Sequence, residues 1–300
     1  MISWRYLGAL LFVTFVGVFP STPVSGAEQS GQEIQSNPAS GAEQSGQPIP
    51  VASDLVNQAN APLSSIMQIR FRNAYIPRFK DMSGRGNIFS MDVTMPLPAY
   101  RLLPIKHLTL LSAPVAVTNP GPKGVTGFGD LRFMDLALLH ESKKFIFGVG
   151  PSFVFPTATE RQTGQGKWQV GPAAGVAFLT KRLMLGAIFQ NPISFAGDKD
   201  RPYANYMMLQ PFVTYQIGKG WFVRSQPQMI FDWRTEFKVI PIDLGVGRTF
   251  KIGRQDVNCY VQPFWNFANR GHPPQYGINA GISLLFPEFW KRIAARRERR

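Results

Sequence analysis

The alternation of apolar with small or polar residues between Lys144 and Thr180 constrains the fold more than any other feature. Two runs, Phe145–Phe155 and Trp168–Thr180, have an apolar residue at nearly every second position and contain no charged residue. A period of two is typical of β-strands, because an α-helix would scatter these positions around its circumference. Each run is about a dozen residues long, which suits a tilted strand that crosses a bilayer. The stretch therefore predicts a transmembrane β-hairpin.

The same pattern continues from Ile66 onward and predicts an all-β fold, a closed antiparallel transmembrane β-barrel of about twelve strands. Tight turns, such as Lys181–Arg182 and Gly218–Gly220, alternate with longer polar loops, such as Asn73–Gly86 and Thr157–Lys167. Bacterial barrels show the same alternation of short periplasmic turns and long outer loops. The expected strands are 66–72, 87–96, 107–117, 128–140, 144–156, 168–180, 182–195, 203–217, 220–233, 237–250, 256–268 and 275–286.

Composition agrees with this fold and narrows the possible partners. Charged residues make up only 17% of the 300 residues, although the formal net charge is +14. The basic residues are spread over turns and the C-terminal end, and no nucleic-acid-binding motif collects them, so we expect no nucleic acid partner. The single cysteine, Cys259, excludes an intramolecular disulfide and a cysteine-built metal site. We expect no metal and no cofactor.

Residues 1–27 are predicted to be a cleaved signal peptide. Arg5 supplies the positive start, Leu7–Phe19 the apolar core and Ser25–Ala27 the small residues of a cleavage site. An uncleaved anchor helix is the alternative, but the apolar core is short and is interrupted by Pro20 and Pro23. The sequence therefore predicts export.

Residues 28–63 are predicted to be a flexible, low-complexity leader before the barrel at 64–286. The octet SGAEQSGQ occurs at Ser25–Gln32 and again at Ser40–Gln47. Such a composition offers too little apolar surface to offset the entropy of ordering. A plug in the lumen is the alternative for the more apolar Val51–Leu63.

Residues 287–300 are predicted to be a basic C-terminal tail, either solvated or in contact with anionic lipid headgroups. The strand before it, Tyr276–Phe286, ends on an aromatic residue, as outer-membrane barrels commonly do for assembly. The expected macromolecular partners are therefore outer-membrane lipids and the barrel assembly machinery.

The strand face opposite the apolar one is rich in amide side chains, whereas a solvent-exposed face would carry lysine and glutamate. This composition predicts a confined polar lumen. A soluble, lipocalin-like barrel with inverted faces is the alternative. The predicted lumen-lining residues are Arg70, Arg72, Asp92, Asp130, Arg132, Gln169, Gln190, Tyr206, Gln210, Arg224, Gln226, Gln228, Asp232, Asp243, Asn258, Tyr260, Gln262 and Asn279.

Four arginines and four aspartates in that set leave the lumen without a strongly dominant sign. We expect these charges to face the lumen, since a charge that faces lipid would cost about 2–4 kcal/mol at the midplane. Pairing across the lumen, which would brace it, is one role for them, and contact with the substrate is the alternative. Asp135 departs from this rule, because it shares its face with Leu131, Phe133 and Leu139. A bulge or a shifted strand boundary would explain the exception.

Proline recurs in the middle of seven successive strands. Because proline cannot donate a hydrogen bond to a ladder, we expect bulges or kinks at these positions. They are Pro151, Pro172, Pro192, Pro211, Pro227, Pro241 and Pro263.

Three motifs occur in sequence order, the first before the Lys144–Thr180 hairpin and the other two within it. They are Gly127–Leu131 (GFGDL), Phe155–Thr159 (FPTAT) and Gly164–Pro172 (GQGKWQVGP). In them the chain resembles the outer-membrane transporters named for the meta-pathway of phenol degradation, over residues 66–286. The resemblance implies a barrel in the outer membrane of a Gram-negative bacterium that passes small hydrophobic or aromatic compounds.

Two other functions are alternatives to a channel. A structural or adhesive barrel without transport would have a closed lumen with its arginines and aspartates fully paired. An outer-membrane lipid-modifying enzyme would need a serine beside one of His107, His140 and His272, and no such arrangement is evident from the sequence. We therefore expect no catalytic residues.

Overall fold

The structure, a computed structural model, describes residues 53–63, 66–99, 104–118, 124–235, 237–268 and 272–290. All of these belong to one compact unit, Gly46–Arg300. The predicted signal peptide, most of the predicted leader and residues 291–300 of the predicted tail lie outside the described residues.

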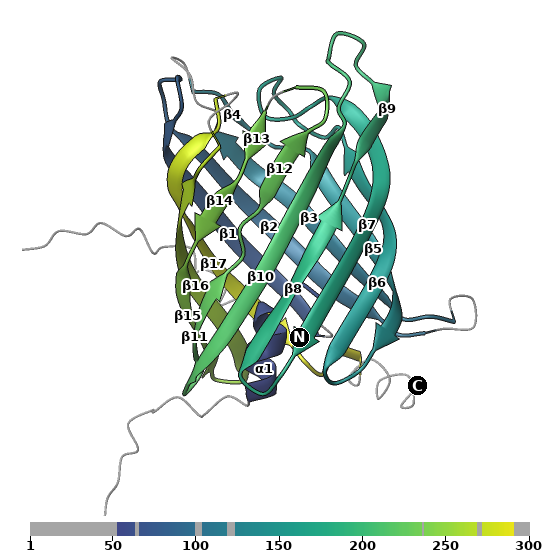
Figure 1. The fold of residues 1–300 in the computed structure, drawn as a ribbon, viewed down its shortest axis with the longest axis vertical. Helices are drawn as coiled ribbons and strands as arrows, with labels where there is room; N and C mark the ends of the chain where they lie inside the picture. Colours follow the sequence, from purple (N-terminus) through teal and green to yellow (C-terminus); the bar gives the residue numbers. More distant parts are fainter. Residues whose placement is uncertain are drawn as a thin grey trace, which may run out of the picture. The chain divides into compact units, whose positions relative to one another are not determined.

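One continuous antiparallel sheet closes on itself, because β1 (Met67–Phe79) pairs with both β2 (Gly86–Leu97) and β17 (Pro274–Phe286) (Figure 1). In the described part of the chain the result is a closed 12-strand barrel, as predicted. Several of the twelve are built from short segments in line: β4 with β5, β8 with β9, β11 with β12, and β13 with β14 and β15. The other elements are α1 (Ser53–Asn60), β3 (His107–Thr118), β4 (Thr126–Gly127), β5 (Leu131–Glu141), β6 (Phe145–Phe155), β7 (Lys167–Leu179), β8 (Leu183–Gln190), β9 (Ile193–Gly197), β10 (Tyr206–Gly218), β11 (Trp221–Ser225), β12 (Met229–Asp232), β13 (Lys238–Val239), β14 (Pro241–Asp243), β15 (Gly245–Ile252) and β16 (Gln255–Asn266).

The first strand is longer than the sequence predicts. The expected loop Asn73–Gly86 is wrong for most of its length, because β1 continues to Phe79 and pairs with β17 and β2 on its two sides. Pro77 and the adjacent basic residues obscure the alternation in the sequence. The structure absorbs the proline in a register shift against β17 between Tyr75 and Arg78.

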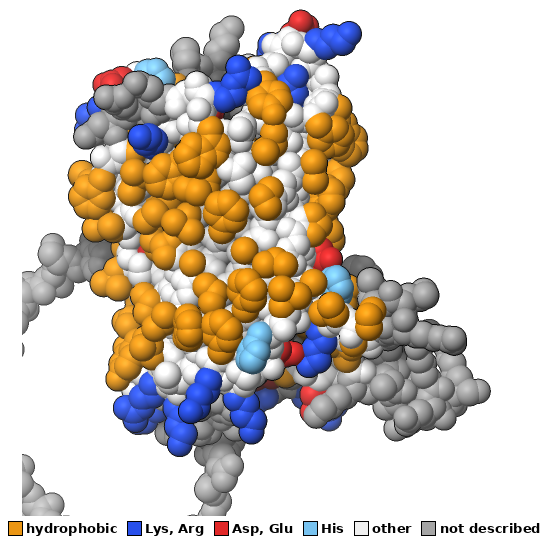
Figure 2. All heavy atoms as spheres, turned by 45° about the vertical axis from the view of Figure 1, so that its right-hand side comes forward, with side chains coloured by type: hydrophobic (Ala, Val, Ile, Leu, Met, Phe, Trp, Pro, Cys, Tyr) orange, Lys and Arg blue, Asp and Glu red, His pale blue; other side chains and the backbone are white. Residues whose placement is uncertain are grey.

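The outward face of the barrel is apolar. Phe178 on β7 is 48% exposed, whereas its neighbour Ala177 is fully buried on the interior side. Figure 2 shows hydrophobic side chains spread over the middle of the visible wall, with lysine and arginine side chains gathered toward its two ends. This distribution matches a hydrocarbon-facing band between two polar interfaces.

Large aromatic side chains stand near the strand ends, as a barrel with aromatic girdles requires. Trp265 and Tyr276 stack on each other at the long-loop end, with 5.6 Å between ring centroids. The exposed aromatic residues at strand ends are Trp168, Tyr203, Trp221, Trp233, Trp265 and Tyr276.

The expected irregularities at the prolines are present, on one or both sides of each strand. Pro192 and Pro227 fall in the gaps between β8 and β9 and between β11 and β12, and Pro241 begins β14 after a break. Pro211 lies in the unbroken β10, where its pairing with β8 is regular. On its other side, pairing stops at Val213 and resumes at Leu209. A proline without an N–H interrupts only the ladder that its nitrogen faces, which explains the one-sided breaks.

The C-terminal end of the predicted leader differs from a flexible segment. Residues 53–63, here called the plug segment, contain α1 and lie inside the short-turn end of the barrel (Figure 1). Val56 packs against Phe222 and Tyr260 on β11 and β16. Leu63 joins the main apolar cluster of the interior, which includes Leu136 and Met184 of β5 and β8. The segment therefore spans the interior between opposite walls.

Polar contacts fix the plug segment as well. The Asn57 side chain donates to the Thr180 carbonyl oxygen at 2.9 Å and accepts from Gln216 Nε2 at 2.5 Å. Leu63 occupies space that Gly175 leaves free, since a Cβ at that glycine would lie 2.8 Å from Leu63 Cδ2.

In the part of the chain that the structure describes, helices of the length and apolarity needed for a bilayer crossing are missing.

Candidate functional site

Three adjoining cavities follow one another in the barrel interior from the long-loop end to the plug segment. The outermost, the vestibule, measures about 350 Å³ and is lined largely by apolar side chains of the strand ends. The middle cavity, about 420 Å³, shares Ile88, Val117 and Asn279 with the vestibule. The inner cavity, about 140 Å³, shares Arg72 and Arg132 with the middle one and ends at Pro62 of the plug segment. Neighbouring cavities thus share parts of their walls, and the plug segment bounds the inner one.

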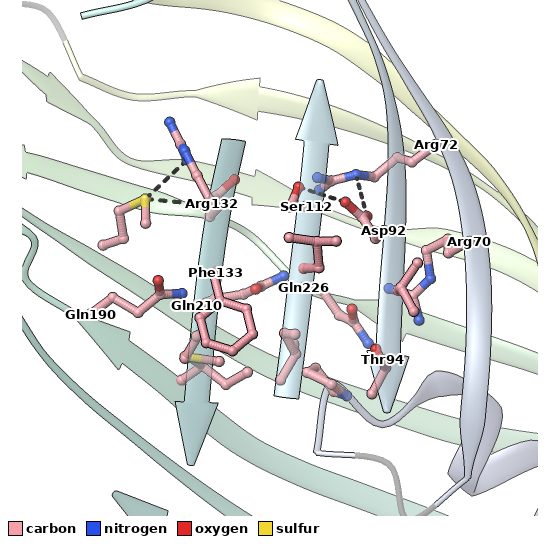
Figure 3. Close-up of a pocket in the computed structure, with 18 residues that line it drawn as sticks. Arg70, Arg72, Asp92, Thr94, Ser112, Arg132, Phe133, Gln190, Gln210 and Gln226 are labelled. Atoms are coloured by element: carbon pink, nitrogen blue, oxygen red, sulfur yellow. Dashed lines mark hydrogen bonds and ion pairs between the residues drawn. The ribbon is translucent and has the colours of Figure 1, made fainter. Parts of the chain in front are cut away.

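Arg72 and Asp92 form an ion pair across the β1–β2 ladder on the cavity wall (Figure 3). Arg72 Nε lies 3.4 Å from Asp92 Oδ2, and Ser112 Oγ of β3 donates to Asp92 Oδ1 at 2.6 Å. The carboxylate therefore has a partner for each oxygen, and the charge of Arg72 is largely offset.

Two other arginines hold the C-terminal end of α1. Arg70 donates to Ser283 Oγ at 3.1 Å and to the Ala59 carbonyl oxygen at 3.5 Å. Arg224, 4% exposed, lies over the ring of Tyr260 at 4.0 Å and reaches Asn60 Oδ1 at 3.5 Å. Cations near the last carbonyls of a helix interact favourably with its dipole, so both arginines stabilise the plug segment.

Three aspartates of the predicted set bind backbone rather than arginine. Asp130 accepts the amide protons of Ala158 and Gln165, which fixes the loop between β6 and β7 over the cavity. Asp243 accepts from Ser225 Oγ at 2.9 Å and from the Gln226 amide at 2.8 Å, at the gap between the β11–β15 pairing and the β12–β13 pairing.

Asp232 closes the turn after β12 by accepting the amides of Arg234 and Thr235. Among the described residues, Arg72–Asp92 is consequently the one ion pair formed within the predicted eight charges. The expectation that the eight pair with one another is wrong for the rest. Backbone amides and the Ser225 hydroxyl satisfy the other three aspartates, and oxygen atoms of the plug segment accept from Arg70 and Arg224.

Arg132 is the remaining charge and has the poorest set of partners. Its Nη1 donates to the thioether sulfur of Met208 at 3.4 Å, and its Nε is buried without a partner. It lines both the middle and the inner cavity, which are also lined by amide side chains of β8, of β10 and of the break between β11 and β12.

The predicted lumen residues divide into two groups. Those that line the three cavities are Arg70, Arg72, Asp92, Asp130, Arg132, Gln190, Gln210, Gln226, Gln228, Asp243 and Asn279. The others do not line them. Arg224 and Tyr260 lie against the plug segment, and Asp232 closes a turn. The remaining four are buried in the barrel wall: Gln169, Tyr206, Asn258 and Gln262.

The partner of Asp135 is not predicted by the sequence. This residue faces outward, as its position in the alternation indicates, and Asp135 Oδ2 lies 2.8 Å from His107 Nδ1. The partner on the neighbouring strand, rather than a shifted boundary, accommodates the charge. The adjacent hydroxyl, Thr109 Oγ1, donates to the Met95 carbonyl at 3.0 Å. Among the described residues no serine hydrogen-bonds His107, so the pair lacks a nucleophile.

Comparison with solved structures places the fold among outer-membrane barrels. An outer membrane channel from Pseudomonas putida F1 is similar with a TM-score of 0.54 and 12% identity, over 74% of this chain and 96% of that one. The NanC porin gives 0.47 and 9% identity, over 73% and 98%. The outer membrane phospholipase A from Escherichia coli gives 0.41 and 10% identity, over 78% and 98%. Such identities establish the fold alone.

No protein-family model and no curated protein sequence matches the chain. Membership of the phenol meta-pathway family therefore stays a prediction from the motifs.

Proposed function

We propose that this protein is an outer-membrane channel for small hydrophobic or aromatic compounds, of the kind that the motif resemblance implies. The solute enters at the long-loop end, descends through the vestibule and middle cavity, and passes the plug segment when that segment moves aside. Similarity of fold to an outer membrane channel supports this assignment, as do the outward apolar band and the adjoining interior cavities.

The apolar lining of the vestibule is the observation that carries the substrate class. Porins for sugars and ions need water-lined mouths, whereas an apolar mouth favours partitioning of apolar solutes from water. The vestibule wall includes Ile76, Phe79, Ile88, Ile230, Phe237 and Phe264.

Uptake into liposomes tests the proposal. With lipopolysaccharide in the outer leaflet to slow passive entry, the protein should raise the rate of toluene uptake above that of protein-free liposomes. Uptake of glucosamine, a charged sugar, should rise far less. Equal stimulation of both solutes would contradict a hydrophobic substrate class.

A vestibule variant makes the test specific. Ile230→Gln adds a polar group to the vestibule wall and should lower toluene uptake, because partitioning into the mouth becomes less favourable. Ile252→Gln makes the same change at an exposed site next to the β15–β16 turn and should leave uptake unchanged. An identical loss of toluene uptake in both variants would show that the effect comes from impaired insertion of the protein into the liposomes.

A barrel without transport is the second candidate. It calls for full pairing of the interior charges, and the solitary Arg132 argues against that. An enzyme is disfavoured by the missing serine at His107, the histidine with the best-placed carboxylate. The proposed location, the outer membrane of a Gram-negative bacterium, follows from the same fold similarity.

A further inference from the structure

We propose that the middle cavity contains a binding site for an anionic group, with Arg132 as its principal ligand. The channel's substrates would then be small, largely apolar molecules that carry a carboxylate, such as arene carboxylates. This inference rests on the proposed channel function and adds the charge of the substrate to it.

The coordination of Arg132 is incomplete in a way that a carboxylate would repair. A guanidinium presents five N–H donors in a planar fork that matches the two oxygens of a carboxylate. In Arg132, Nη1 meets only the Met208 sulfur at 3.4 Å, a weak acceptor, and Nε is buried without a partner. Within the described residues no carboxylate lies at ion-pair distance from it. Arg132 is half-buried, and a cation in the barrel interior that has no paired anion is costly unless an anion completes it.

The neighbouring charges are already committed to other partners. Asp92 is occupied by Arg72 and Ser112, and both oxygens of Asp130 accept backbone amide protons. The middle and inner cavities together are lined by Arg70, Arg72 and Arg132 against Asp92 and Asp130, three cations against two anions. Arg70 donates to Ser283 Oγ and to a carbonyl oxygen of the plug segment, so Arg132 is the cation whose donors are free to bind an anion.

Polar groups around Arg132 could orient a bound anion. Figure 3 shows Arg132 of β5 beside the cavity that Gln190 and Gln210 also line, with the Arg72–Asp92 pair on the other side of Ser112.

Apolar side chains complete a site for an amphipathic solute. Leu110, Met134 and Ile188 line the inner cavity next to the arginine, and the apolar vestibule lies above. A solute with an apolar ring and one carboxylate can therefore place its charge at Arg132 while its ring stays out of water.

Titration calorimetry on the full-length protein in detergent tests the site. Benzoate should bind, and benzamide, its neutral isostere, should bind about tenfold to a hundredfold more weakly, because charge-assisted hydrogen bonds are lost. Equal affinity for the two probes, or no detectable benzoate binding, would overturn the proposal.

Variants assign the binding to Arg132. Arg132→Gln should weaken benzoate binding by at least about tenfold. Arg132→Lys, which keeps the charge but not the planar fork, should fall between this variant and the unmodified protein. Arg182→Gln makes the same change of charge at an exposed turn and should leave the affinity unchanged. Retained affinity in both position-132 variants would show that the anion binds elsewhere.

A ring-free carboxylate separates this inference from the proposed function. Should hexanoate bind as tightly as benzoate while toluene uptake is not stimulated, the anion site stands and the hydrophobic channel fails. Should toluene uptake be stimulated without carboxylate binding, the channel stands and the anion site is refuted.

Discussion

At the residue scale, the interior arginines differ through their partners rather than through their position in the alternation. All four share the inward face of their strands, yet Arg70 and Arg224 bind the plug segment, Arg72 binds Asp92, and Arg132 faces the open cavity. Alternation predicts which face a residue occupies. It contains no information about which neighbour reaches it, because those neighbours come from strands far away in the sequence.

Neutralising Asp92 should increase the positive charge of the cavity. Asp92→Asn removes the carboxylate from Arg72 but keeps a polar group of the same size next to Ser112. The ratio of chloride to potassium permeability in planar bilayers should rise, because a second guanidinium becomes available to anions.

Asp198→Asn, in the exposed loop after β9, is the matched control and should change the ratio less. A ratio that is unchanged by Asp92→Asn would mean that ions do not pass beside Arg72.

At the element scale, the plug segment is the least expected part of the structure. Its eight-residue helix is too short to be stable alone and depends on packing inside the barrel. From the sequence alone, this segment is either part of a flexible leader or a plug in the lumen. The barrel interior decides between them, by supplying apolar partners such as Phe222 and hydrogen-bond partners such as Gln216.

Loosening the plug segment should open the channel. The double variant Asn57→Ala/Asn60→Ala removes side-chain bonds to Thr180, Gln216 and Arg224. Each lost interaction leaves buried groups unpaired and costs the closed state about 1–3 kcal/mol. Single-channel recordings should show a higher open probability than in the unmodified protein.

Asn73→Ala is the control for this experiment, since it removes a 3.0 Å hydrogen bond to Asn87 away from the plug segment. Its open probability should match that of the unmodified protein. Currents that are equal in all three proteins would show that the plug segment does not limit conduction.

The mid-strand prolines are a contrasting case at the same scale, because the sequence did predict irregular pairing there. The missing N–H is a property of the residue itself, so its effect on a ladder follows without knowledge of the partner strand. Which side of the strand is interrupted, as at Pro211, depends on the direction of the nitrogen in the folded barrel.

At the scale of the whole molecule, the apolar outer wall and the polar interior together determine where the barrel can reside. Ile282 is 44% exposed on β17, in the middle of the wall, between its partners Phe71 and Cys259. A charged residue there would have to enter hydrocarbon.

Ile282→Lys should therefore destabilise the barrel in lipid vesicles by about 2–4 kcal/mol, whereas Ile252→Lys, next to the β15–β16 turn, should cost about 0–1 kcal/mol. Urea titrations of the folded fraction measure both values. Equal costs at the two positions would contradict a bilayer centred on the middle of the strands.

The sequence alone determined the all-β class, the approximate positions of most strands, the inward and outward faces and the irregular prolines, because each depends on the period of a strand or on the chemistry of one residue. Only the tertiary structure decided the extension of β1, the plug segment, the His107–Asp135 pair and the solitary charge of Arg132. These features arise from contacts between segments far apart in the chain, such as the contact between Arg132 and Met208, which are 76 positions apart. Closure of the barrel brings such segments together, and no local pattern encodes which of them will meet.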